Sequence, residues 1–255
     1  MKQEICNKCN GTGWVAVKKG EQEFVEKCDC IKTDILLTKT EKANIPPKFL
    51  ERKLEWAYQP DSANPSQAAA KKAAQKFIDD YPAVKKGLLF QGEAGRGKTT
   101  LLCAIGYELI EKKNVSVYYI DQNSFVREMR SGEHMITKDF SIINRLIDQL
   151  ADVELLLFDE LGTTVLDKLT PWIYENIYYI FNTRYNNNKI TVCASNYFDV
   201  KDASKSADVK QFTLEERVGN LIRSRLYEMT DIVQIGGSDF REKNLKGIPR
   251  TIRQY

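Results

Sequence analysis

The chain has 255 residues, of which 42% are hydrophobic and 29% charged, and its formal net charge is +3. These values are typical of a soluble globular chain with one ordinary domain and a small addition, and the charge is too small to indicate nucleic-acid binding by itself. No apolar run approaches the roughly 18 residues of a membrane span and the N-terminus lacks the apolar core of a secretory signal, so we expect a cytoplasmic protein with reduced thiols.

Residues 1–32 hold four of the six cysteines, as a C-x-x-C pair and a C-x-C pair separated by a hairpin-length spacer. Four sulfur ligands suit tetrahedral Zn²⁺, and metal binding can fold a segment too short to have its own core. The predicted zinc ligands are Cys6, Cys9, Cys28 and Cys30. An iron–sulfur cluster and unmetallated cysteines are the alternatives. The other two cysteines, Cys103 and Cys193, are expected in the core.

Residues 33–82 have the pattern of a helical linker, with predicted helices at 33–43 and 66–81 separated by proline-containing turns. From about residue 83 apolar strands alternate with longer helices, which predicts an α/β domain over 83–241 with a mostly parallel sheet flanked by helices. Its expected strands are 87–91, 115–120, 154–158, 189–194 and 231–235. Its expected helices are 98–112, 124–131, 141–151, 169–185 and 213–229. A basic tail, 242–255, follows.

A glycine-rich segment between the strand 87–91 and the helix 98–112 matches the pattern G-x-x-x-x-G-K-[ST]. Its glycines let backbone N–H groups converge on phosphate oxygens, and the following helix directs its positive end at the same oxygens. In this pattern Lys98 reaches the β- and γ-phosphates of ATP, and the Thr99 hydroxyl binds Mg²⁺. The predicted nucleotide-binding residues are Gly92, Glu93, Ala94, Gly95, Arg96, Gly97, Lys98, Thr99 and Thr100.

An acidic pair, Asp159 and Glu160, follows the apolar run LLLF. We expect the buried strand 154–158 to present Asp159 at its C-terminal end, where parallel sheets bind ligands. Asp159 would hold Mg²⁺ through water, and Glu160 would orient and deprotonate the attacking water, which favours hydrolysis over binding alone. Asn196, just after the strand 189–194, could position that water; an ordinary turn residue is the alternative.

Several arginines could stabilise the charge that develops on the transferred phosphoryl group. Arg217, Arg223 and Arg225 share the predicted helix 213–229, and Arg225 precedes an apolar residue that could anchor the helix. Arg241 follows the last strand and could reach the γ-phosphate in its own subunit. For each of them a solvated surface arginine is the alternative.

The predicted helix 124–131 combines aromatic and basic character in Phe125, Arg127 and Arg130. Aromatic rings that stack on bases and cations that contact phosphates suit single-stranded DNA. The alternative is a solvated basic face with one buried phenylalanine.

The order of these motifs resembles that of the DnaC/DnaI-type helicase loaders of bacteria and phages, which are AAA+ P-loop NTPases. The resemblance covers nearly the whole chain, and the cysteine module and the two C-terminal arginine motifs make it specific. The motifs are the four cysteines, the glycine loop, the acidic strand, Ala194-Ser195-Asn196, Ser224-Arg225-Leu226 and Ser238-Asp239-Phe240-Arg241. The resemblance implies that Asn196 is the sensor-1 residue, Arg225 a finger acting in trans and Arg241 the sensor-2 arginine.

The resemblance also implies partners. It predicts ATP-dependent self-association into a ring or spiral, binding of single-stranded DNA, and delivery of a replicative hexameric helicase that the N-terminal zinc module grips. ATP, Mg²⁺ and Zn²⁺ are the expected ligands. Two other interpretations stay open: a transposition helper ATPase of the IstB type, which shares the ATPase core, and a nucleotide-dependent scaffold with negligible turnover.

Overall fold

A computed structural model describes residues 6–20, 22–62, 64–133, 141–201 and 211–240. The strands are β1 (Trp14–Lys19), β2 (Gln22–Lys27), β3 (Gly87–Gln91), β4 (Val117–Asp121), β5 (Leu155–Leu161), β6 (Ile190–Ser195) and β7 (Thr230–Gln234). The helices are α1 (Asp29–Lys42), α2 (Leu54–Ala57), α3 (Pro65–Asp80), α4 (Lys98–Lys113), α5 (Gln122–Glu133), α6 (Ser141–Asp152), α7 (Pro171–Asn186) and α8 (Leu214–Met229). Short 3₁₀ turns lie at Pro47–Phe49 and Leu166–Lys168.

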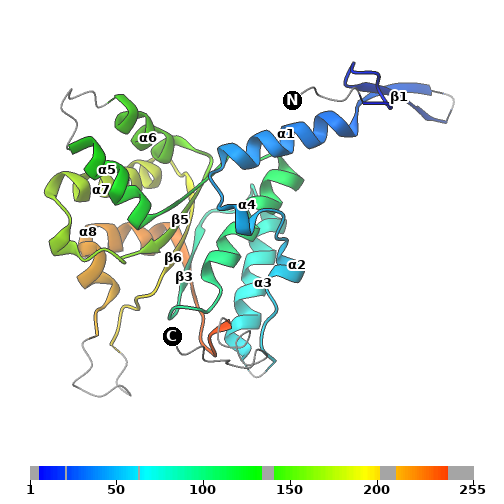
Figure 1. Ribbon diagram of the computed structural model, residues 1–255. Helices are drawn as coiled ribbons and strands as arrows, with labels where there is room; N and C mark the ends of the chain where they lie inside the picture. The colour runs from blue at the N-terminus through cyan, green and yellow to red at the C-terminus, as the bar shows by residue number, and fades with distance from the viewer. Residues whose placement is uncertain (1–5, 21, 63, 134–140, 202–210, 241–255) are drawn as a thin grey trace, which may run out of the picture.

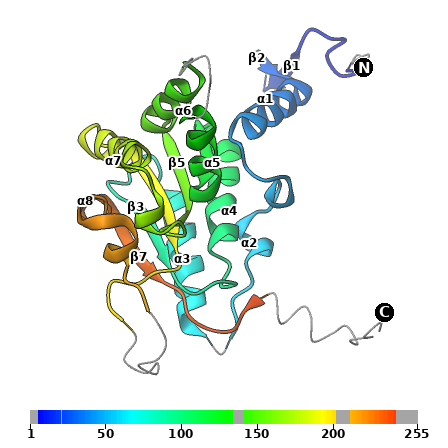
Figure 2. The ribbon, with the colours of Figure 1, turned by 60° about the vertical axis from the view of Figure 1, so that its left-hand side comes forward.

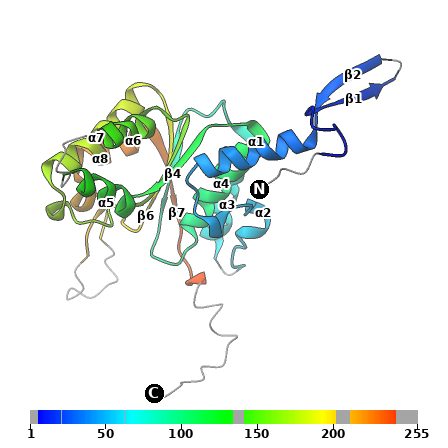
Figure 3. The ribbon, with the colours of Figure 1, turned by 45° about the horizontal axis from the view of Figure 1, so that its top comes forward.

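Five strands form one parallel sheet in the order β4-β5-β6-β3-β7. Side chains alternate along a strand, so β5 contributes residues to a hydrophobic core on each face of the sheet. Leu155 and Leu157 pack on the face covered by α1 to α4. Leu156 and Phe158 pack on the face covered by α5 to α8. The two helical layers enclose the sheet (Figures 1 and 3). The predicted AAA+ fold class is confirmed, and so is the core placement of Cys103 and Cys193, which are both fully buried.

The strand β5 differs from its prediction in length. It continues to Leu161, and its pairing with β6 shifts register between Phe158 and Leu161. Glu160 has a left-handed backbone with φ of 54°, which is uncommon for a residue other than glycine. The acidic pair therefore lies within an irregular strand end and not beyond it, because the strand continues past this local kink.

The helix α1 begins at Asp29, four residues before its predicted start, and so crosses the module boundary predicted at residue 32. Cys28 is extended and precedes the first turn, where the acidic Asp29 suits the positive end of the helix. Cys30 thus lies on this helix. Before α1 in the chain, β1 and β2 form an antiparallel hairpin. The hairpin extends from the N-terminal end of α1, away from α7 and α8 (Figures 1 and 2).

A buried arginine holds together the edge of the sheet where the strands begin. Arg184 on α7 is fully buried and donates hydrogen bonds to the carbonyls of Leu150 (3.0 Å), Val153 (2.7 Å) and Ile190 (2.5 Å). Its Nε donates to the Thr191 hydroxyl at 2.8 Å. This one side chain satisfies carbonyls at the end of α6, which helix geometry leaves unpaired, and a carbonyl at the start of β6. No helix in the described parts of the chain is long and apolar enough to cross a membrane.

Candidate nucleotide and zinc sites

The glycine loop lies between the end of β3 and the start of α4. Gly95 and Gly97 have φ of 78° and 80°, and Gly97 is the left-handed residue from which α4 begins. A β-carbon on Gly97 would lie 2.6 Å from the ring of Tyr58, so both conformation and space require glycine. The unpaired N–H groups of the first turn of α4 point into the loop, and this arrangement is suited to phosphate oxygens.

Lys98 and Thr99 connect this loop to the acidic strand. The Lys98 ammonium folds back and donates to the carbonyls of Gly92 (2.7 Å) and Glu93 (2.9 Å). The Thr99 hydroxyl donates to Asp159 Oδ2 at 2.6 Å. Residues separated by 60 positions in the chain therefore meet at one point, because β3 and β5 both end at the same edge of the sheet.

A cavity of about 570 Å³ opens at this point, within the size range of small-molecule pockets. Most of the residues predicted to bind phosphate or to take part in hydrolysis line it: Ala94, Gly95, Gly97, Lys98, Thr99, Thr100, Asp159, Glu160 and Asn196. Gly92 and Glu93 accept the hydrogen bonds of Lys98 with their carbonyls, and Arg96 forms an ion pair with Glu93 at 2.7 Å. Most of the predicted nucleotide site is thus gathered in one cavity. Arg225 does not line it, and Arg241 lies outside the described residues.

The Asp159 carboxylate is 2% exposed and accepts three hydrogen bonds. Besides Thr99, the donors are the Tyr119 hydroxyl at 3.0 Å and the backbone N–H of Glu160 at 2.8 Å. Burial raises the pKa of Asp159, while these donors and the charge of Lys98 act in the opposite direction. A carboxylate held in one orientation beside a threonine hydroxyl is a suitable ligand set for Mg²⁺.

Glu160 lines the same cavity as Asp159 and accepts a hydrogen bond from Asn123 Nδ2 at 3.0 Å. Partial burial raises the pKa of Glu160, and the charges of Asp159 and Asp121 raise it further. A glutamate with a raised pKa that lines the cavity is the side chain best placed to accept a proton from water.

Four side chains around this site were not predicted from the sequence. Tyr119 and Asn123 contact the acidic pair from β4 and from the first turn of α5. Lys48 and Arg52, from the turn before α2, line the cavity beside the Phe49 ring, with the Lys48 ammonium 4.8 Å from its centre. No local pattern identifies these residues, since only the pairing of β4 with β5 and the path of the linker bring them to the site.

The three arginines of α8 have different surroundings. Arg217 is buried, and its guanidinium donates to the carbonyls of Gly162 and Thr163 in its own chain. Arg223 forms an ion pair with Asp199. Arg225 lies over the Tyr185 ring at 4.5 Å, donates to Asn182 at 3.1 Å, and stays partly exposed. Of the three, Arg217 is therefore the one whose contacts leave it least able to reach another subunit.

The four N-terminal cysteines converge at the base of the hairpin. The Sγ atoms of Cys6 and Cys28 are 3.8 Å apart, those of Cys9 and Cys30 are 3.6 Å apart, and all four lie within 4.8 Å of one another. Sulfurs at about 2.3 Å from a tetrahedral zinc ion are separated by about 3.8 Å, so these four residues fit Zn²⁺. A two-stranded hairpin is marginally stable alone, which gives such an ion a structural purpose.

The expectation that Phe125 on the basic helix α5 stacks on a base is wrong. Phe125 is fully buried and its ring packs 6.4 Å from that of Phe158, so it is not available to stack on a base. The apolar face of α5 is directed at the sheet, and Phe125 lies on that face. Arg127 and Arg130 line a separate surface hollow of about 620 Å³ together with Asn123 and Thr164. The alternative of a basic face with a buried phenylalanine is thus the observed one.

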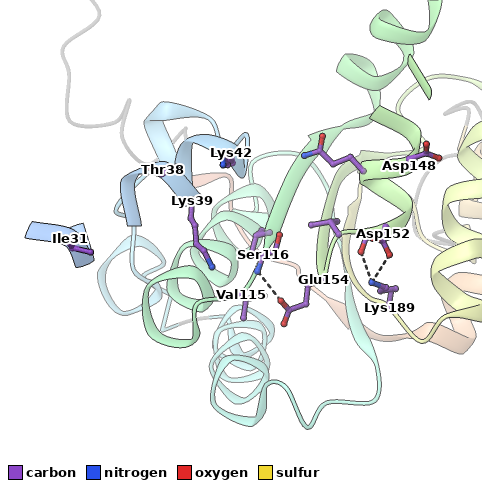
Figure 4. Close-up of a pocket in the computed structure, with 13 residues that line it drawn as sticks. Ile31, Thr38, Lys39, Lys42, Val115, Ser116, Asp148, Asp152, Glu154 and Lys189 are labelled. Atoms are coloured by element: carbon purple, nitrogen blue, oxygen red, sulfur yellow. Dashed lines mark hydrogen bonds and ion pairs between the residues drawn. The ribbon is translucent and has the colours of Figure 1, made fainter. Parts of the chain in front are cut away.

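A larger hollow, of about 980 Å³, lies at the opposite edge of the sheet, between α1 and α6 (Figure 4). Several of its charged groups already have partners. Lys189 pairs with Asp152 at 3.0 Å, Glu154 accepts from the Ser116 N–H at 3.2 Å, and Lys39 donates to a backbone carbonyl. None of the described residues that line it belongs to the glycine loop or the acidic pair, so its size alone does not make it the nucleotide site.

The sequence matches the family described as "IstB-like ATP binding protein" over residues 36–247. It is 24% identical to the phage-like element PBSX protein XkdC of Bacillus subtilis (strain 168) over 235 residues, which are 88% of this chain and 79% of that protein. It is 24% identical to the replicative helicase loader DnaI of the same organism over 217 residues, 79% of this chain and 67% of that protein.

Solved structures show the same relationship. The crystal structure of the DnaC helicase loader matches with a TM-score of 0.58 and 29% identity, covering 74% of this chain and 99% of that one. The family resemblance drawn from the motifs is confirmed by these similarities.

Proposed function

The chain belongs to the IstB-like ATP binding protein family, and from this premise we propose that it is an ATP-hydrolysing helicase loader that acts in DNA replication. One observation carries the proposal: Lys98, Thr99 and the Asp159–Glu160 pair line a single cavity at the strand-end edge of the sheet. A scaffold that only binds nucleotide has no need of Glu160, and this carboxylate favours turnover.

In the proposed reaction the chain holds MgATP and activates water. The glycine-loop amides and Lys98 bind the phosphates, while Thr99 and Asp159 hold Mg²⁺, which neutralises charge on the phosphates when bound. Glu160 accepts the proton of the attacking water, and Asn123 keeps its carboxylate in place beforehand. Asn196, which directly follows β6 and lines the same cavity, orients the same water.

Self-association completes the site in this proposal. Arg225 acts on the nucleotide of a neighbouring subunit in a ring or spiral, and Arg241 acts in its own subunit. Support for the first role comes from the partial exposure of Arg225 on α8, where it stacks on Tyr185, donates to Asn182 and forms a long ion pair with Glu228 at 4.0 Å. An exposed ion pair at this distance contributes little free energy, so Arg225 can exchange Glu228 for a phosphate at small cost.

The N-terminal module contacts the replicative hexameric helicase in this proposal. Cys6, Cys9, Cys28 and Cys30 hold a structural Zn²⁺, and the hairpin built on them presents apolar side chains to solvent. Trp14 is 51% exposed and Val25 is 69% exposed, so the hairpin offers apolar surface to a partner. The relatives DnaI and DnaC are described as helicase loaders, which supports the choice of partner.

Single-stranded DNA is the second proposed partner. Arg127 and Arg130 face solvent on α5, close to Asn123, and offer contacts to phosphates. Because Phe125 is buried, we expect this surface to bind the backbone without base stacking, and hence with a strong dependence on salt.

Co-purification tests the function. The chain, loaded with MgATP, is mixed with candidate replicative hexamers and separated by size. We expect co-migration, its loss with Cys28→Ser or with Trp14→Ala, and full ATP binding by both variants. The Trp14→Ala variant keeps the zinc ligands, so it separates loss of the contact from loss of the fold. A chain that migrates apart from every hexamer in each nucleotide state would overturn the proposed partner and favour a transposition helper.

A further inference from the structure

One buried cation near the nucleotide site has no part in the mechanism above. Arg217 on α8 is 5% exposed, yet it does not line the nucleotide cavity. Its Nε donates to the Gly162 carbonyl at 2.6 Å, and its Nη2 donates to the Thr163 carbonyl. A buried guanidinium is costly unless its donors are used, and here both acceptors belong to one short turn of the same chain.

This turn directly follows the acidic pair. The Thr163 N–H donates to the Glu160 carbonyl at 3.0 Å, which closes the turn, and the Gly162 N–H donates to Gln122 Oε1 at 2.5 Å. Gly162 has φ of 87°, and a β-carbon there would lie 3.0 Å from the β-carbon of Arg217. The turn is thus held from α5 on one side and packed against Arg217 on the other, two residues from the proposed base.

Arg217 also contacts the neighbouring strand tip. Its guanidinium lies over the Tyr197 ring at 4.5 Å, and Tyr197 immediately follows Asn196. The Tyr197 carbonyl accepts from Gln91 at the end of β3 at 3.1 Å, and the Ser195 hydroxyl donates to the Leu161 carbonyl at 2.7 Å. A single side chain therefore touches the tips of both β5 and β6, the strands that carry Glu160 and Asn196.

The helix segment that carries Arg217 is hydrogen-bonded to the segment that follows β6. Thr213 and Glu216 form a reciprocal capping box, and the Leu214 N–H donates to the Phe198 carbonyl at 2.7 Å. Gly219, with φ of 79° and ψ of 156°, then breaks the helix before Arg225. The first turns of α8 thus pack with the catalytic edge, separately from the part that follows the break.

We propose that Arg217 is a positioning residue for ATP hydrolysis, which holds the turn after Glu160 and the tip that carries Asn196 in one fixed arrangement. The inference rests on the proposed ATPase function and replaces a role for Arg217 in a neighbouring subunit. Displacement of a reacting group by about 1 Å can cost on the order of 100-fold in rate, so looser tips would slow hydrolysis while the phosphate loop still binds MgATP.

The test compares two conservative variants of buried arginines, Arg217→Lys and Arg184→Lys. Lysine keeps the charge but not the planar fork, so each variant loses carbonyl contacts and some thermal stability. Arg184 lies at the other edge of the sheet and serves as the matched control. Below both melting temperatures we measure MgATP affinity, kcat, and amide hydrogen exchange at residues 160–164 and 195–198.

For Arg217→Lys we expect kcat to fall by about 10- to 100-fold with MgATP affinity within about threefold of wild type, and faster exchange in both segments. Arg184→Lys should keep kcat and the exchange of these segments. Equal kcat for the two variants, or unchanged exchange in Arg217→Lys, would overturn the inference. A wild type that binds MgATP without turnover would refute the ATPase proposal instead, and the exchange data alone would then decide the role of Arg217.

Discussion

At the edge of the sheet where the strands begin, Arg184 is buried among backbone carbonyls, and at the edge where they end, Arg217 is buried in the same way. The first edge borders the larger hollow, whose lysines and carboxylates largely pair with one another or with the backbone (Figure 4). The second borders a smaller cavity with the helix N-terminus of α4, the buried Asp159 and the left-handed Glu160.

The difference teaches that the direction of the strands, more than the size of a hollow, determines where chemistry occurs. In a parallel sheet with helical crossovers, the helices that follow the strands present their unpaired N–H groups at the strand-end edge only. The other edge receives helix C-termini with unpaired carbonyls, which a buried arginine can satisfy. A similar guanidinium thus supports packing at one edge and the arrangement of a reactive site at the other.

The largest expected effect on ATP turnover distinguishes two glutamates at opposite ends of β5. We expect Glu160→Gln to lower ATP turnover by about 10²- to 10⁴-fold with MgATP binding retained, because the amide cannot accept a proton. Glu154→Gln, at the strand-beginning edge, keeps the acceptor for the Ser116 N–H and should keep full turnover. A steady-state ATPase assay with a parallel binding titration measures both, and equal turnover of the two variants would contradict the site.

Stability should be most sensitive at the other edge. Arg184→Met leaves the carbonyls of Leu150, Val153 and Ile190 buried without a donor, so we expect a loss of about 3 kcal/mol or more in the free energy of unfolding. Urea denaturation measures it. MgATP affinity of the folded variant should be unchanged, and an affinity loss would show that the two edges are not independent.

ATP affinity should depend on the lysine at the strand-end edge and not on the lysine at the opposite edge. Lys98→Ala removes a charge-assisted contact to phosphate, worth about 1.5–3 kcal/mol, and so we expect ATP affinity to fall by roughly 10- to 100-fold. Lys189→Ala removes an ion pair at the opposite edge and should leave the affinity unaltered. Calorimetric titration of ATP into both variants gives the comparison. Unchanged affinity in Lys98→Ala would reject the assignment of the loop.

The smallest effect concerns Asp199, whose pKa is lowered by hydrogen bonds from Arg223 and, to a smaller extent, from Tyr227. A carboxyl with a lowered folded-state pKa stabilises the fold above its unfolded value of about 3.9, and this contribution is lost as pH falls through the folded-state pKa. Asp199→Asn should therefore cost about 1 kcal/mol or less at neutral pH, with a difference that shrinks below about pH 4. Thermal unfolding from pH 7 to pH 3 measures it, and a difference that grows toward acid would contradict the sign.

Much of the fold was predictable because apolar runs bounded by turns are local signals. The strand 87–91 was placed with its observed bounds, and most other boundaries lay within a few residues. The two clear departures have local physical causes that periodicity does not reveal. β5 continues past Phe158 through a kink at Glu160, and α1 begins ahead of its predicted start because Cys28 ends the extended segment.

The sequence motifs of the site were predictable, but the side chains that hydrogen-bond to those motifs and hold them in place were not. Lys98, Asp159 and Glu160 carry recognisable spacing, whereas Tyr119, Asn123 and Arg217 are single side chains with no pattern around them. Arg217 shows the limit well. From the sequence it was grouped with Arg223 and Arg225 as a possible transition-state arginine, with a solvated surface arginine as the alternative. Only the packing of α8 against the ends of β5 and β6 shows that it is buried in its own chain.

The sequence by itself determined that the chain has a phosphate loop, an acidic strand and a cysteine module, because each depends on residue types at short, fixed spacings. The tertiary structure alone decided which distant side chains support these motifs, which arginine is buried and which is exposed, and that Phe125 is in the core. These outcomes depend on which helix covers which face of the sheet, and that arrangement is set by contacts between segments far apart in the chain.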